Sequence, residues 1–182
     1  MVITKANLEA LYRVPENGKA EIVDGEVVTI CPTGSRPARA EIRIAASLLR
    51  HEEEQGGGFA FGDNAGFIVD LPHRTTFSPD AAWYVGDVEG MKFLHGAPRF
   101  AVEVRSDNDY GPAEDRAIQD KIRDYFATVT LVVWDVDLLG EEVIKKYTFD
   151  APDTPVIFRR GEIADAEPGV PGWTLPVDRL FR

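Results

Sequence analysis

The chain has 182 residues, of which 44% are hydrophobic and 28% charged, as in ordinary globular proteins. Its formal net charge of -11 argues against a protein that coats nucleic acid non-specifically, because neutralising phosphates requires a basic surface. Cys31 is the single cysteine, so an intramolecular disulfide is excluded. The sequence has no apolar run of membrane-span length and no signal-peptide pattern, so we expect one cytoplasmic domain over residues 1–182.

The first part of the chain predicts a helix, a hairpin and a longer helix. Residues 4–12 carry apolar side chains at helical spacing. Within 20–30, Asp24-Gly25 separates two apolar-rich runs, which is the signal of a two-residue hairpin turn. A second helix is predicted over 37–55, and three consecutive glycines at 56–58 end it.

The remainder predicts strands on both sides of a third helix. Strands are expected near 59–62, 65–70, 80–85, 98–105, 131–136 and 142–149, with a loop at 86–97 and the helix at 113–127. The run 131–136 is almost continuously apolar, which is typical of a strand buried on both faces. The proline-rich tail predicts mostly irregular structure with one strand at 155–158. This order predicts an α/β (α+β) fold, a mixed sheet flanked by helices.

Two carboxylates occupy strand positions that need a counter-charge. Asp80 ends Ser78-Pro79-Asp80, and Glu103 lies 23 positions later in the apolar strand 100–105. A divalent metal prefers hard oxygen ligands, so one interpretation is that Asp80, Glu103 and the carbonyl oxygen of Val104 bind a metal. A structural ion pair between Glu103 and Arg105, or between Glu103 and a lysine, explains the spacing equally well.

Lys121 and Glu21 are further candidates. Lys121 lies at the edge of the apolar stripe of the third helix, from which it could reach the carboxylates and hold a water or a phosphate oxygen. The alternative is an exposed lysine whose aliphatic part covers the surface. Glu21 begins the first strand and could supply a third carboxylate, or it could be an ordinary surface residue.

Other kinds of site find little support in the sequence. His51, His73 and His95 show no metal-ligand spacing, so zinc is not expected. No phosphate-binding loop, dinucleotide fingerprint or serine elbow occurs. A carboxylate pair also suits a glycosidase, but the tryptophans form no sugar-stacking pattern. Four arginines in or next to the second helix either form a local basic patch or solvate one face, namely Arg36, Arg39, Arg43 and Arg50.

In their order and spacing, several segments resemble the Uma-type restriction endonucleases, a branch of the PD-(D/E)XK nuclease superfamily. The resemblance covers nearly the whole chain. It rests on residues 20–28, 78–82, 97–106, 120–125 and 131–136, and on the ending at 171–175 and 180–181.

The resemblance implies a restriction-endonuclease-like core, hydrolysis of nucleic acid (DNA in the first place) with Mg²⁺ or Mn²⁺, and a homodimer. It implies Asp80 and Glu103 as metal ligands and Glu21 as a further acidic residue. The superfamily's usual lysine lies two residues after the second acid, where this chain has Arg105. The resemblance instead points to Lys121 on the following helix. Arginine cannot act as a general base, so Arg105 is a secondary candidate that would stabilise charge on the phosphate.

One departure from the family favours a second hypothesis. The family often has a histidine before the second helix, where this chain has Pro37 or a neighbouring residue. Together with the acidic charge, this departure is compatible with a catalytically inactive nuclease fold that serves as a binding or assembly module.

Overall fold

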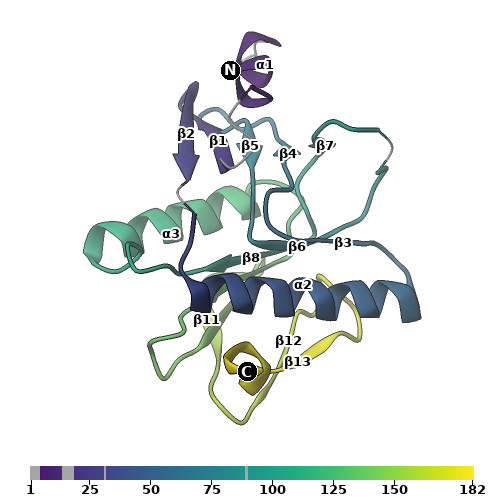
Figure 1. Ribbon diagram of the computed structural model, residues 1–182, viewed down its shortest axis with the longest axis vertical. Coiled ribbons are helices and arrows are strands. Elements are labelled where there is room, and N and C mark those ends of the chain that lie inside the picture. Colours follow the sequence, from purple (N-terminus) through teal and green to yellow (C-terminus); the bar gives the residue numbers. More distant parts are fainter. Residues whose placement is uncertain (1–4, 14–18, 31, 89) are drawn as a thin grey trace.

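A six-stranded mixed sheet runs through the middle of the molecule, with a long helix on each face (Figure 1). The computed structural model describes residues 5–13, 19–30, 32–88 and 90–182, so Cys31 and residue 4 of the first predicted helix lie outside the described residues. The strand order is β11-β10-β9-β8-β6-β3. β8 and β9 run parallel, and every other neighbouring pair in this sheet is antiparallel.

The elements have the following bounds. The helices are α1 (Lys5–Leu11), α2 (Ser35–Gln55), α3 (Pro112–Phe126) and the 3₁₀ helix η1 (Val177–Phe181). The central strands are β3 (Phe59–Phe61), β6 (Ala81–Tyr84), β8 (Phe100–Val104), β9 (Val132–Val136), β10 (Ile144–Thr148) and β11 (Ala151–Phe158). Three smaller sheets are formed by β1 (Lys19–Val23) with β2 (Glu26–Ile30), by β4 (Phe67–Ile68) with β5 (Thr76–Phe77) and β7 (Leu94–His95), and by β12 (Ile163–Asp165) with β13 (Thr174–Pro176).

The alternation of side chains along β8 separates two cores. Phe100, Val102 and Val104 pack with the buried face of α2, while Ala101 packs with Ile122 of α3 on the other side of the sheet. Glu103 has the same parity as Ala101 and therefore projects toward α3. All five residues of β9 are buried, which confirms the prediction of a strand covered on both faces.

The hairpin of β1 and β2 stands above the sheet and is tied to the segment before β6. Asp24 and Gly25 both have positive φ, 51° and 77°, as a two-residue hairpin turn requires. The Ile22 N–H donates to Thr76 Oγ1 at 2.7 Å, and the Thr75 N–H donates to the Ile22 carbonyl at 3.1 Å. These bonds fix the side chains of β1 over one end of the sheet.

The tail departs from the prediction of mostly irregular structure. β11 spans eight residues and tolerates Pro152 and Pro155 because it is the edge strand of the main sheet. The tail then adds β12, β13 and η1, and η1 packs against α2. The predicted loop 86–97 contains β7, and β5 was not predicted. Both strands are two residues long, too short for a periodic pattern.

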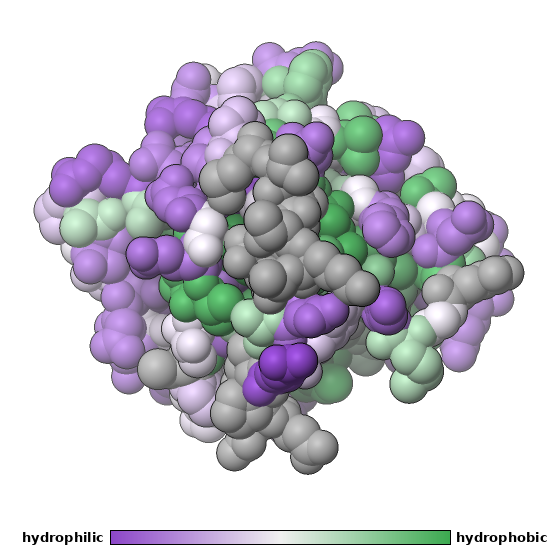
Figure 2. Space-filling view, turned by 90° about the horizontal axis from the view of Figure 1, so that it is seen from above, coloured by the Kyte–Doolittle hydropathy of each residue, from purple (hydrophilic) through white to green (hydrophobic). Residues whose placement is uncertain are grey.

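Seen from the α1 end, the surface carries hydrophilic side chains around most of its periphery and hydrophobic ones between them (Figure 2). Among the described helices, none is long and apolar enough to cross a membrane.

Candidate active site

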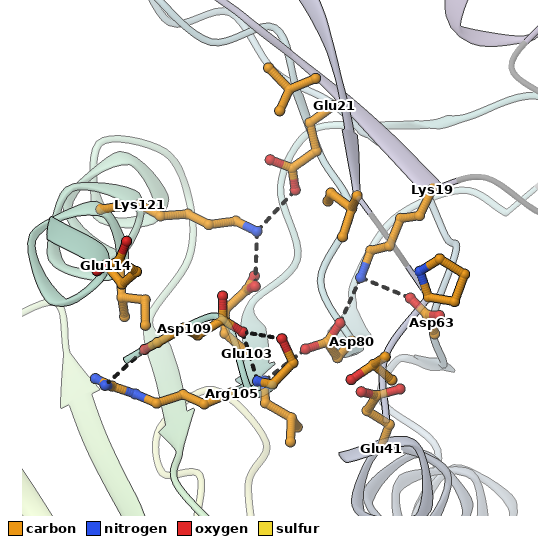
Figure 3. Close-up of a pocket in the computed structure, with 18 of the residues that line it drawn as sticks. Lys19, Glu21, Glu41, Asp63, Asp80, Glu103, Arg105, Asp109, Glu114 and Lys121 are labelled. Carbon is orange, nitrogen blue, oxygen red and sulfur yellow. Dashed lines mark hydrogen bonds and ion pairs between the residues drawn. The ribbon is translucent and has the colours of Figure 1, made fainter. Parts of the chain in front are cut away.

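A cavity of about 630 Å³ lies where the hairpin, α2, α3 and the ends of β6 and β8 meet. Charged side chains from all of these elements converge on it (Figure 3). The charged groups that matter most are Lys19, Glu21, Glu41, Asp80, Glu103 and Lys121.

Lys121 on α3 bridges two of the predicted carboxylates. Its Nζ lies 2.8 Å from Glu103 Oε2 and 3.0 Å from Glu21 Oε1 (Figure 3). The Tyr125 hydroxyl, one turn further along α3, donates to Glu103 Oε1 at 2.7 Å. Lys121 and Glu103 side chains each remain 17% exposed, so both can still be reached from the cavity. Glu103, Glu21 and Lys121 thus form a single hydrogen-bonded group.

Asp80 lies beside this group because β6 pairs with β8. Its N–H donates to the Val102 carbonyl at 2.9 Å, and its Oδ2 accepts the Val104 N–H at 2.7 Å. Its Oδ1 accepts from Lys19 Nζ at 2.6 Å. Val104 also lines the cavity, so the predicted metal-binding segment 103–104 and Asp80 are neighbours at one end of the sheet.

A buried network of charged groups fixes Glu21 on the side away from the cavity. Its Oε2 accepts from Arg74 Nη1 at 2.6 Å, and its Oε1 accepts the Ser78 N–H at 2.8 Å. Arg74 Nε donates in turn to Asp124 Oδ2 at 2.8 Å, and Asp124 Oδ1 lies 2.6 Å from His73 Nε2. The position of Glu21, and through it that of Lys121, is therefore fixed by interactions on the side away from the cavity.

Glu41 and Asp63 add two carboxylates near Asp80. Asp63 Oδ1 lies 2.8 Å from Lys19 Nζ, so Lys19 joins Asp63 to Asp80. Glu41 reaches from α2 toward Asp80, is 7% exposed, and makes no hydrogen bond within the described part of the chain (Figure 3). This side of the cavity holds more carboxylates than cations.

Arg105 lines the cavity, but its guanidinium is committed to other acidic groups. Nε and Nη2 donate to the two oxygens of Asp135 at 2.7 Å each, and Nη1 donates to Asp115 Oδ1 at 2.6 Å. The Arg105 side chain is 7% exposed. Of the two ion-pair partners considered for Glu103, Arg105 or a lysine, the structure shows a lysine, Lys121. Arg105 pairs with Asp135 and Asp115.

The network shifts the proton affinities of its members. Burial would lower the pKa of Lys121, but the charges of Glu103 and Glu21 outweigh it and raise that pKa. Burial would raise the pKa of Glu21, but Lys121 and Arg74 lower it below the ordinary value. For Glu103, burial and the charges of Asp80 and Glu21 raise the pKa although Lys121 opposes them. Lys121 is therefore a cation at neutral pH.

Crowding of carboxylates has its clearest effect on Glu41. Burial, followed by the charges of Asp80 and Asp63, raises the pKa of Glu41 to about 7. Burial would lower the pKa of Lys19, but Asp80, Glu103 and the hydrogen bonds to Asp63 and Asp80 raise it. The cavity is thus a region of negative potential.

The donor set suits a hard divalent cation, although the described residues contain no ready-made cluster of three metal-binding side chains. Asp80 and Glu103 both present carboxylate oxygens to this cavity, and Glu41 adds a carboxylate that has no hydrogen-bond partner within the described residues. In the described structure, the Lys19 ammonium pairs with Asp80 and the Lys121 ammonium pairs with Glu103.

The structure brings together the predicted residues Glu21, Asp80, Glu103 and Lys121 and adds four that sequence reasoning missed, namely Lys19, Glu41, Asp63 and Arg74. Two of the four carried a signal. Lys19 lies two residues before Glu21 on one strand and so shares its face. Glu41 falls on the stripe of α2 formed by Ile44 and Leu48, where an acidic residue must be buried. Asp63 and Arg74 lie in connections and carried no comparable signal.

Comparison with known proteins identifies relatives of the whole chain. The profile of the Uma2 family, described as "Putative restriction endonuclease", matches residues 6–178. A crystal structure described as "a putative nuclease belonging to DUF820" from Anabaena variabilis superposes with a TM-score of 0.73 at 15% identity, over 96% of each chain. The fold is therefore restriction-endonuclease-like, a mixed sheet flanked by helices. No protein of curated function matches the sequence.

Proposed function

Because the chain belongs to the Uma2 family, we propose that it is a metal-dependent endonuclease that hydrolyses phosphodiester bonds, with DNA as substrate and Mg²⁺ or Mn²⁺ as cofactor. The observation that carries this proposal is the meeting of Glu21, Asp80, Glu103 and Lys121 in one cavity. Asp80, Glu103 and the carbonyl of Val104 would hold the cation. When bound, it would supply Lewis-acid stabilisation of charge on the scissile phosphate.

The side chains of the site have distinct tasks in this proposal. Lys121 is cationic and fixed between Glu103 and Glu21, so it would neutralise a phosphate oxygen or orient the attacking water. Glu21 positions Lys121 because Arg74 and the Ser78 N–H hold its carboxylate. The Tyr125 hydroxyl fixes the second oxygen of Glu103. Arg105 is a secondary residue: its guanidinium is paired with Asp135 and Asp115, so from the wall of the cavity it would act on the phosphate only through the remaining field of its charge.

The proposal is tested by incubating supercoiled plasmid with the protein and Mg²⁺ or Mn²⁺, with and without a chelator. We expect nicking that requires the cation and falls by about a hundredfold or more in Glu103→Gln and in Lys121→Met. Lys146→Met is the matched control, because Lys146 forms a similar 2.7 Å pair with Asp165 outside this cavity. Circular dichroism verifies that each variant is folded.

Two outcomes would contradict the assignment. Cleavage that survives both Glu103→Gln and Lys121→Met unchanged would show that these residues do not form the active site. A folded wild-type protein that cleaves no nucleic acid with any divalent cation would favour the inactive binding or assembly module instead.

A homodimer is part of the proposal, because two copies of the site would suit cleavage of both strands of a duplex. Sedimentation equilibrium over a range of concentrations would then give twice the mass of one chain. A mass of one chain at all concentrations would remove this part of the proposal and leave the site untouched.

A further inference from the structure

The two lysines of the cavity are held in different ways. Lys121 lies between Glu103 and Glu21, and Glu21 is itself anchored by Arg74 and by the Ser78 N–H. Lys19 lies between Asp80 and Asp63, and the Asp63 side chain is 38% exposed. Lys121 is therefore fixed at both of its contacts, while Lys19 has one partner at the surface.

Lys19 occupies the free side of Asp80. Asp80 Oδ2 accepts the Val104 N–H at 2.7 Å, and Oδ1 accepts from Lys19 Nζ at 2.6 Å. The Lys19 side chain is only 10% exposed and lines the same cavity as Glu103. A second positive charge at Oδ1 would repel this ammonium strongly at such a short distance.

From this geometry we propose that Lys19 is an internal competitor for the divalent cation, which binds by displacing the Lys19 ammonium from Asp80. The inference rests on the proposed function, because it takes Asp80 as a metal ligand. Asp63 lets the displaced ammonium remain paired, since it already lies 2.8 Å from Lys19 Nζ and is closer to solvent. The Lys19 ammonium thus neutralises the Asp80 carboxylate until a divalent cation displaces it.

The charge balance around Asp80 makes the exchange favourable. Glu41, Asp63 and Asp80 face a single ammonium on this side of the cavity, and Glu41 has no hydrogen bond within the described residues. A divalent cation at Asp80, with Lys19 retained at Asp63, balances these carboxylates better than Lys19 alone. Lys121 has no partner as exposed as Asp63 to retain it, because Glu21 is 6% and Glu103 17% exposed against 38% for Asp63.

The test is calorimetric titration of Mn²⁺ into the wild-type protein, Lys19→Met, Lys19→Arg, Asp80→Ala and Lys146→Met. We expect Lys19→Met to bind Mn²⁺ about tenfold more tightly, the gain that follows if Asp80 is free of Lys19 in about a tenth of wild-type molecules. Lys19→Arg keeps the competing charge and should show no gain. Lys146→Met removes a lysine of equal exposure paired with Asp165, so its Mn²⁺ affinity should equal that of the wild type.

A second readout separates competition from a merely structural role. Without metal, Lys19→Met should unfold at lower temperature than the wild type, because Asp80 loses its counter-charge. If Lys19 were only structural, Lys19→Met would lower both the thermal stability and the Mn²⁺ affinity. If Lys19 competes with the cation, the same substitution lowers the thermal stability and raises the Mn²⁺ affinity.

The outcomes distinguish this inference from the proposed function. Binding that depends on Asp80 but is equal or weaker in Lys19→Met would overturn the competition and leave the metal site standing. Binding that persists unchanged in Asp80→Ala, or absent binding in every variant, would overturn both. Binding gained only in Lys19→Met would support the competition directly.

Discussion

Buried carboxylates in this protein differ in what balances their charge. Asp135 is 1% exposed, and each of its two carboxylate oxygens accepts a hydrogen bond from the Arg105 guanidinium. Glu41 is similarly buried but has no such partner within the described chain. The first arrangement stabilises the fold, and the second keeps an acidic group available at the cavity.

Arg105→Met should therefore destabilise the protein by about 3–5 kcal/mol, because Asp135 is left buried and unpaired. Urea unfolding measures the loss. Arg123→Met is the control, since Arg123 is 58% exposed in its pairs with Asp120 and Asp153 and its removal should cost about 1 kcal/mol or less. Equal losses in the two variants would show that Arg105 does not stabilise the fold by neutralising Asp135.

Glu41→Gln should change how stability depends on pH. The pKa of Glu41 is about 7 in the folded protein against an ordinary value of 4.5, so the folded state binds the proton more tightly than the unfolded state. Wild-type stability should consequently fall as pH rises from about 4.5 to about 7, and the loss is complete above about 7. The glutamine variant does not titrate, so it gains stability relative to the wild type across this interval.

Unfolding in chelator at pH values between about 4 and about 8 checks this expectation. Glu53→Gln, on an exposed position of the same helix, controls for general charge removal. A stability difference between Glu41→Gln and the wild type that stays constant with pH would contradict it.

The sequence predicted the acidic residues of the site better than their partners. Asp80, Glu103 and Glu21 lie in or beside patterned strands. The helical spacing put Lys121 only at the edge of an apolar stripe, and the resemblance to the nuclease family favoured it. Lys19 shares the face of Glu21 on its strand, but Asp63 and Arg74 meet the site only through long-range contacts with the hairpin that leave no local signal. Arg105, two residues after Glu103, pairs instead with Asp135 of the neighbouring strand β9 and with Asp115 of α3.

At the scale of elements, the β1–β2 hairpin is the part that completes the site. It carries Lys19 and Glu21, and it is joined to the rest of the fold through the Ile22 N–H bond to Thr76 Oγ1 and the Thr75 N–H bond to the Ile22 carbonyl. The turn residues Asp24-Gly25 predicted this hairpin, but its docking position depends on tertiary contacts.

Thr76→Val should loosen the docking, because the buried Ile22 N–H loses its acceptor at a cost of about 1–3 kcal/mol. Thr75→Val is a matched control, since Thr75 is equally buried and its Oγ1 has no hydrogen-bond partner within the described structure. Thermal unfolding should show a loss for Thr76→Val and little or none for Thr75→Val. The reverse order would contradict the role given to Thr76.

Element predictions failed mainly in the tail. Its prolines suggested irregular structure, yet β11 accommodates Pro152 and Pro155 because an edge strand has one side without a partner in the sheet. Helices α2 and α3 and strands β8 to β10 agreed with prediction because their apolar periodicity is long and regular.

On the scale of the whole molecule, the sheet separates two cores and brings a helix to each face, and the site lies where both helices and the hairpin approach the end of β8 (Figure 1). The cavity shares the acidic character of the whole chain, whose net charge is -11, because its lining holds more carboxylates than lysines and arginines. An acidic molecule of this kind would depend on bound cations to approach a nucleic-acid phosphate.

The most direct test of the metal site is a crystal of the protein soaked in Mn²⁺, with anomalous diffraction measured at a wavelength sensitive to manganese. We expect an anomalous peak within bonding distance of the carboxylates of Asp80 and Glu103. A well-ordered cavity without any such peak, or a peak bound only by residues outside the cavity, would contradict it.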